Sequence, residues 1–115
     1  MFGPCTDFAC SGGPRLTTLR DTQEMAVRVN RIYCTAHGIR PTSDWYLLKL
    51  QEEVGEAAAA YLASRGANRR ATSGEHLSEE LADVICFALL IAHDNDIDID
   101  LAIHKKWACY DQTLP

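Results

Sequence analysis

Helical spacing dominates the hydrophobic pattern of this chain. The apolar residues Met25, Val29 and Ile32 recur at intervals of three or four positions, which is the period of one face of an α-helix. The segment Thr18–Asp21 before them resembles a capping box with Asp in place of Glu, and Gly38 after them suits the end of a helix. The pattern therefore predicts a first helix from near Thr18 to Gly38.

Three further helices follow from the same signals. They are predicted from Thr42 or Ser43 to just before Gly66, from between Glu75 and Ser78 to near Asn95, and from the region of Asp98 to Tyr110. The one stretch that alternates like a strand, residues 96–100, contains three aspartates, which favour a turn and a helix start instead. Because helices joined by short loops pack as antiparallel bundles, we expect an all-α antiparallel helical bundle of three main helices plus a short C-terminal helix.

Glycine, proline and charge mark the connections. Residues 1–14 are rich in Gly and Pro, so we expect an irregular N-terminal arm there. The remaining residues, 15–115, are expected to form one helical domain, because this length buries a single core. Between the second and third helices, Ala67–Gly74 is expected to be a polar, basic loop that carries Arg69 and Arg70.

Composition narrows the classes of partner. The formal net charge is -5 and no long basic run occurs, which argues against a nucleic-acid polymer, since affinity for one grows with the phosphates that Lys and Arg neutralise. The longest apolar stretch, Val84–Ala92, falls far short of the roughly 20 residues of a membrane helix. The start, Met1–Cys5, lacks the regions of a signal peptide, and five irregularly spaced cysteines do not resemble a disulfide framework. We therefore expect a cytoplasmic protein with free thiols.

The second predicted helix carries a pair of inward-leaning acids. Glu53 and Glu56 are three residues apart and so share one face. The apolar residues that share an arc of this helix are Leu47, Leu50, Val54, Ala57, Ala58 and Tyr61. We predict that this arc faces the core, with Glu53 at its edge and Glu56 just beyond.

The third predicted helix carries a second pair, Glu80 and Asp83. From Leu81 to Ala92 the only charged residue is Asp83, and the apolar residues around it predict a helix that is covered on all sides. An unpaired carboxylate in such surroundings would cost several kcal/mol. Asp83 therefore needs compensation, either from a divalent cation or from an Arg or Lys.

Two helices with these pairs would bring four carboxylates to one cleft. A site made only of carboxylate oxygens suits Mg²⁺, with Mn²⁺ as the alternative, and does not suit zinc. We therefore predict a metal site formed by Glu53, Glu56, Glu80 and Asp83. The alternative is that the acids form solvated faces and that Asp83 pairs with a basic side chain.

The two motifs resemble the signature of the MazG-type, all-α nucleoside triphosphate pyrophosphohydrolase superfamily. Glu52–Glu56 matches its E-E-x-x-E half and Glu80–Val84 its E-x-x-D half, and the resemblance covers residues 45–106. It implies Mg²⁺-dependent hydrolysis of a nucleoside triphosphate to the monophosphate and pyrophosphate, with the four acids above as metal ligands. It also implies a homodimer or homotetramer in which helices from two subunits complete the site. Lys106 matches the lysine that follows the second motif in many members, whereas Tyr110 and Thr113 stand where their Asn and Arg would fall.

Candidate substrate contacts surround the acids. They are Lys49, Glu52, Trp45, Lys106, Arg69 and Arg70, and Glu53 is the first candidate among the acids to orient or deprotonate water. Lys49 could instead form an intrahelical pair with Glu52 or Glu53, Trp45 could pack in the core, and the arginines could be solvated. The leading hypothesis is a nucleotide pyrophosphohydrolase that acts on an NTP or dNTP. The alternatives are a phosphoribosyl-ATP pyrophosphohydrolase and a non-catalytic helical module that binds nucleotide or another protein.

Overall fold

The computed structural model describes residues 15, 18–67 and 75–111. Its helices are α1 (Leu19–Ala36), α2 (Ser43–Ser64), α3 (Glu75–Asp94) and a continuous C-terminal run of α4 (Ile99–Ile103), the π-helical turn η2 (His104–Ala108) and α5 (Cys109–Asp111). These residues contain no strand, so the all-α prediction is confirmed. The predicted N-terminal arm, residues 1–14, and most of the basic loop before α3 lie outside the described residues.

Side-chain caps fix where α1 and α2 begin. The Thr18 hydroxyl accepts a hydrogen bond from the backbone N–H of Asp21 at 3.0 Å, and the Thr42 hydroxyl accepts one from that of Trp45 at 3.2 Å. Each bond satisfies a backbone donor that the first turn of a helix leaves without a carbonyl partner. The predicted starts of both helices are therefore confirmed.

Residues in the left-handed region end the three long helices. Gly38 adopts a φ of +64° after α1, and the next residue, Ile39, donates its N–H back to the Cys34 carbonyl at 2.8 Å. This backward bond satisfies a carbonyl that the helix end would leave unbonded. Gly66 ends α2 at a φ of +70°, and Asp96 follows α3 at +53°.

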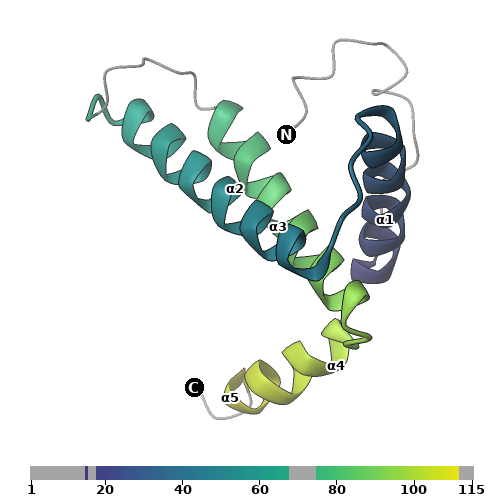
Figure 1. The fold of residues 1–115 in the computed structure, drawn as a ribbon. Helices are drawn as coiled ribbons and strands as arrows, with labels where there is room; N and C mark the ends of the chain where they lie inside the picture. Colours follow the sequence, from purple (N-terminus) through teal and green to yellow (C-terminus); the bar gives the residue numbers. More distant parts are fainter. Residues whose placement is uncertain (1–14, 16–17, 68–74, 112–115) are drawn as a thin grey trace.

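The two acid-bearing helices lie together. Figure 1 shows α2 and α3 running antiparallel, side by side, with α1 packed across the C-terminal half of α3. At that crossing the Gln23 side chain donates to the Leu89 carbonyl at 3.0 Å. The run from α4 to α5 extends away from the other helices (Figure 1) and packs mainly on itself.

A small core holds α1, α2 and α3 together. Its buried centre consists of Ala26, Phe87 and Leu90, and the partly buried apolar residues against it are Val27, Trp45, Tyr46, Leu50 and Cys86. The face that α2 turns inward beyond this centre is built of small residues, with Ala57, Ala60 and Ala63 all buried. Small side chains let two helix backbones approach closely, which positions the acids of α2 against α3.

The predicted core arc of α2 is wrong for most of its length. Leu47, Val54 and Tyr61 are 59%, 49% and 46% exposed, because α3 packs on the face that carries Glu53 and the alanines. The expectation that α3 is covered on all sides is wrong as well. Its residues Leu81 and Ile85 are also about half exposed, since one chain has no further helix to cover them.

None of the described helices combines the length and the apolar character that crossing a bilayer requires.

Candidate metal centre

Glu53 occupies the centre of the contact between α2 and α3. Its side chain is 0% exposed, and it is one of the two largest fully buried side chains in the described structure. The sequence pattern placed Asp83 as the deeply buried acid, which is wrong, because Asp83 is only half-buried. Glu53 is buried more deeply because the alanine face of α2 brings its backbone close to α3.

The acids predicted to bind metal come together. Carboxylate oxygens of Glu53, Glu80 and Asp83 lie within 4.8 Å of one another. Glu56 interacts with this group, because Glu53 and Glu80 both act to lower its pKa. The i, i+3 spacing on each of two antiparallel helices produces this convergence.

Protons compensate part of the charge in this cluster. Burial raises the pKa of Glu53 from 4.5 to about 7, assisted by a hydrogen bond to Glu56 and by the charges of Asp83 and Glu56. A carboxyl with a pKa near 7 is largely protonated in mildly acidic solution.

The pKa values of the two neighbouring glutamates, Glu56 and Glu80, shift in opposite directions. Burial acts to raise the pKa of Glu56, but hydrogen bonds from Glu53 and Glu80 outweigh it, so the pKa is lowered. Burial, the hydrogen bond to Glu56 and nearby negative charge raise the pKa of Glu80. Ionisation is therefore easier for Glu56 than for Glu53 and Glu80, whose protonated forms are favoured by burial and by the nearby negative charge.

The donor set fits a hard divalent cation. It consists of carboxylate oxygens alone, the ligands that Mg²⁺ and Mn²⁺ prefer. Among the described residues, the buried Oε2 atom of Glu80 has no hydrogen-bond partner, and a buried polar atom of this kind is stabilised by a bound ion. Glu53, Glu56, Glu80 and Asp83 would hold the ion.

Lys49 places a positive charge beside the cluster. Its Nζ atom lies 3.0 Å from Glu52 Oε2 and 3.8 Å from Glu53 Oε1, so the predicted intrahelical pairing is confirmed. Burial opposes the charge on Lys49, but the hydrogen bond and charge of Glu52, with the charge of Glu53, raise its pKa. Glu52 itself is half-exposed and faces Lys49 from the outer side of the helix.

Trp45 packs at the edge of the core. Its ring meets the ring of Phe87 edge-on, with centroids 5.9 Å apart, and that of Tyr46 at 5.3 Å. Such pairs stabilise a core beyond the area they bury. The core-packing interpretation of Trp45 thus agrees with the structure.

Of the remaining predicted contacts the structure describes only Lys106, and this residue is not brought to the acids. Lys106 lies in η2, within the C-terminal run that extends away from α2 and α3 (Figure 1). Tyr110 is 62% exposed on the same run. Arg69, Arg70 and Thr113 lie outside the described residues.

One buried polar residue escaped the sequence reasoning. Asn30 is 4% exposed and stands on the inward face of α1, between Ala26 and Cys34. Helical spacing alone could have found it, because it puts Asn30 in line with these residues one turn away on either side. An amide at a core position breaks the apolar pattern, and such breaks concentrate at functional sites.

No protein-family model matches the chain, and no curated protein matches it significantly.

Proposed function

We propose that this protein is a Mg²⁺-dependent nucleotide pyrophosphohydrolase of the MazG type, which cleaves an NTP or dNTP to the monophosphate and pyrophosphate. The observation that carries the proposal is the convergence of four carboxylates between α2 and α3, with three of them inside 4.8 Å and Glu53 fully buried. One buried and three partly buried acids this close together require compensation, which a bound divalent cation would supply.

In this proposal the metal ion and the residues around the cluster have different roles in the reaction. Mg²⁺, when bound, would neutralise charge on the triphosphate and on the leaving pyrophosphate. Glu53, with a pKa of about 7, can accept a proton from the attacking water near neutral pH. The oxygen of that water bonds to the α-phosphorus, and the bond to the oxygen bridging the α- and β-phosphates breaks. Lys49, which stays protonated beside Glu53, attracts the phosphate charge.

The proposal includes a second copy of the chain. Both helices of the α2–α3 hairpin carry large apolar residues that stay exposed, namely Leu47, Leu48, Val54, Tyr61 and Leu62 on α2 and Leu81 and Ile85 on α3. Exposed apolar patches of this kind mark protein interfaces. Pairing two α2–α3 hairpins through these faces would complete a helical bundle, as a homodimer or as half of a homotetramer.

A second copy also offers a place for Lys106. The C-terminal run carries its own exposed apolar residues, Leu101, Ile103, Trp107 and Tyr110, and makes little contact with α1, α2 and α3. In an oligomer this run would pack on the neighbouring subunit. Lys106 would then contribute a positive charge to the acids of that subunit.

Pyrophosphate release from a panel of NTPs, dNTPs and phosphoribosyl-ATP, with and without Mg²⁺, tests the proposal. We expect Mg²⁺-dependent release, reduced at least about 100-fold in Glu53→Gln, since loss of a general base costs this much or more. The control is Glu79→Gln on α3, whose carboxylate lies outside the cluster near His76 and whose loss should leave release unchanged.

Two outcomes of this experiment would replace the proposed function with one of the alternatives. Cleavage of phosphoribosyl-ATP alone would assign the narrower pyrophosphohydrolase. Tight nucleotide binding with no release from any substrate would assign a non-catalytic nucleotide-binding module.

A further inference from the structure

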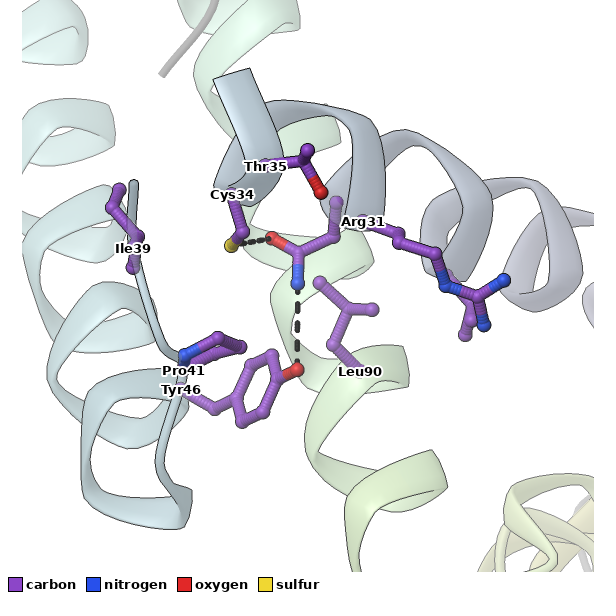
Figure 2. Close-up of a pocket in the computed structure, with 9 residues that line it drawn as sticks. Arg31, Cys34, Thr35, Ile39, Pro41, Tyr46 and Leu90 are labelled. Atoms are coloured by element: carbon purple, nitrogen blue, oxygen red, sulfur yellow. Dashed lines mark hydrogen bonds between the residues drawn. The ribbon is translucent and has the colours of Figure 1, made fainter. Parts of the chain in front are cut away.

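A cavity of about 270 Å³ lies where the end of α1 meets the start of α2. Figure 2 shows its walls, with Cys34 from α1, Ile39 and Pro41 from the connection, Tyr46 from α2 and Leu90 from α3. Ligand pockets for whole drug-sized molecules usually span about 300–1,000 Å³. This cavity is therefore suited to one ring system and not to a whole nucleotide.

The buried carboxamide of Asn30 lines this cavity. Its Nδ2 atom donates to the Tyr46 hydroxyl at 3.4 Å, and its Oδ1 atom accepts from the Cys34 thiol at 3.7 Å, the two bonds drawn as dashed lines in Figure 2. Both bonds are long or weak by the usual geometry. Within the described structure they leave one amide hydrogen and one oxygen lone pair of Asn30 for a further partner.

The interior of the cavity is uncharged. Burial raises the pKa of the Cys34 thiol and also that of the Tyr46 phenol, so both groups stay neutral near pH 7. Arg31 also lines the cavity, but its guanidinium extends away from Cys34 and Tyr46 (Figure 2). A charged ligand group would therefore lose its water without gaining a counter-charge.

The Asn30 carboxamide also lies close to the candidate metal site. Asn30 lines a second cavity, of about 190 Å³, between α1 and α3, and the wall of that cavity includes Asp83. Asn30 thus separates the first cavity from the space beside the acid cluster.

We infer that the first cavity binds an uncharged, planar nucleobase whose hydrogen-bonding edge is read by the Asn30 carboxamide. A carboxamide presents a donor and an acceptor side by side, and nucleobases present the complementary pair on one edge. The apolar walls from Ile39, Pro41 and Leu90 cover the faces of the ring. The identification of the ring as a nucleobase rests on the proposed function. The paired donor and acceptor of Asn30 and the neutral lining of the cavity are independent of it.

Binding of free nucleosides in EDTA tests the inference apart from metal chemistry. Adenosine, guanosine, cytidine and uridine are titrated to about 10 mM, which detects weak binding, and amide resonances are followed by NMR. We expect at least one nucleoside to shift the signals of the Asn30 side-chain NH₂ and of residues 39–46. In Asn30→Leu the affinity should fall at least about tenfold, since a two-bond contact of this kind discriminates by that much or more.

The control replaces an asparagine elsewhere. Asn95→Leu changes an exposed amide at the end of α3 that bonds to the Ile91 carbonyl, and it should leave nucleoside binding unchanged. Circular dichroism checks that Asn30→Leu folds. The wild-type shift of the Asn30 NH₂ signal provides a readout that does not depend on the variant.

The substrate panel then identifies the source of the base. If Asn30→Leu changes the preference among NTPs, the cavity holds the base of the substrate itself. If it abolishes nucleoside binding and leaves that preference intact, the cavity holds a separate nucleoside.

The inference is overturned if no nucleoside binds, or if Asn30→Leu binds nucleosides as tightly as the wild type does. Nucleoside binding that depends on Asn30, together with no pyrophosphate release, would refute the proposed function and leave the inference standing.

Discussion

At the scale of single residues, Glu53 shows how burial turns an ordinary acid into a group that exchanges protons near neutral pH. The side chain has no access to water, and the charged form is destabilised both by that burial and by the acids around it. Removal of one charge from the cluster and addition of a cation both reduce this electrostatic destabilisation.

The metal-free protein should therefore lose stability between pH 5 and pH 8. The folded pKa of Glu53, about 7, lies above its ordinary value of 4.5. The stability that this group contributes is present below pH 4.5 and is lost as the pH rises through 7, up to about 3 kcal/mol for this shift. The lowered pKa of Glu56 acts in the opposite direction and below this window. Urea unfolding in EDTA at both pH values measures the loss.

The same experiment on Glu53→Gln isolates the group responsible. The neutral amide cannot ionise, so the loss of stability between pH 5 and pH 8 should become smaller than in the wild type. An unchanged loss would show that other groups cause it.

Asp83→Asn should abolish Mg²⁺-dependent turnover and leave the fold intact. The variant removes one anion from the cluster, where each close like-charged pair costs on the order of a few kcal/mol at an effective dielectric of ~20. We therefore expect its melting temperature in EDTA to equal or exceed that of the wild type, with little gain on adding Mg²⁺.

Thermal melts of both proteins, with EDTA and with Mg²⁺, decide the role of Asp83. A variant that melts far below the wild type in EDTA would indicate a structural ion pair, since breaking a buried pair typically costs about 3–5 kcal/mol.

At the scale of elements, the distance between the acids depends on the alanine face of α2. Ala57, Ala60 and Ala63 are buried and set how closely α2 approaches α3. Interiors packed this tightly tolerate added volume poorly, so the face controls both stability and the geometry of the cluster.

Ala60→Leu should destabilise the protein by about 1–3 kcal/mol, the usual cost of overpacking, and weaken Mg²⁺ binding because it separates the two helices. Ala59→Leu is the matched control, since Ala59 is exposed on the same helix and leucine is nearly as good a helix former as alanine. Urea unfolding and Mg²⁺ titration compare the two variants. Equal effects at both positions would show that helix contact does not set the metal affinity.

At the scale of the whole molecule, the apolar surface left open by one chain calls for a partner. Residues with long apolar side chains are about half exposed along α2, α3 and the C-terminal run. The buried centre of the core, Ala26, Phe87 and Leu90, is small for this length. Association would bury the remaining surface and add stability that the single chain lacks.

Light scattering at micromolar concentration should therefore report a dimer or tetramer. Leu47→Lys should shift the mass toward the monomer, because it places a charge on the exposed apolar face of α2. Glu24→Lys, on the exposed side of α1, is the control and should keep the wild-type mass. A monomeric wild type would refute the proposed assembly.

Helix type and helix ends were decided by the sequence itself. The spacing of apolar residues, the caps at Thr18 and Thr42 and the turns at Gly38 and Gly66 are local features, whose energies depend on residues within one turn. The i, i+3 pairing of the acids is local too. For this reason the sequence alone could name Glu53, Glu56, Glu80 and Asp83 as a group.

Only the tertiary structure decided which face of each helix is buried. The apolar pattern of α2 predicted that the arc with Leu47 and Val54 is buried, whereas the structure buries the face that carries Glu53 and Ala60. The burial of Glu53 and the partial burial of Asp83 follow from the contact between α2 and α3, and the cavity around Asn30 lies where α1 meets α2 and α3. They involve residues tens of positions apart, and their energies depend on packing that no local sequence window contains.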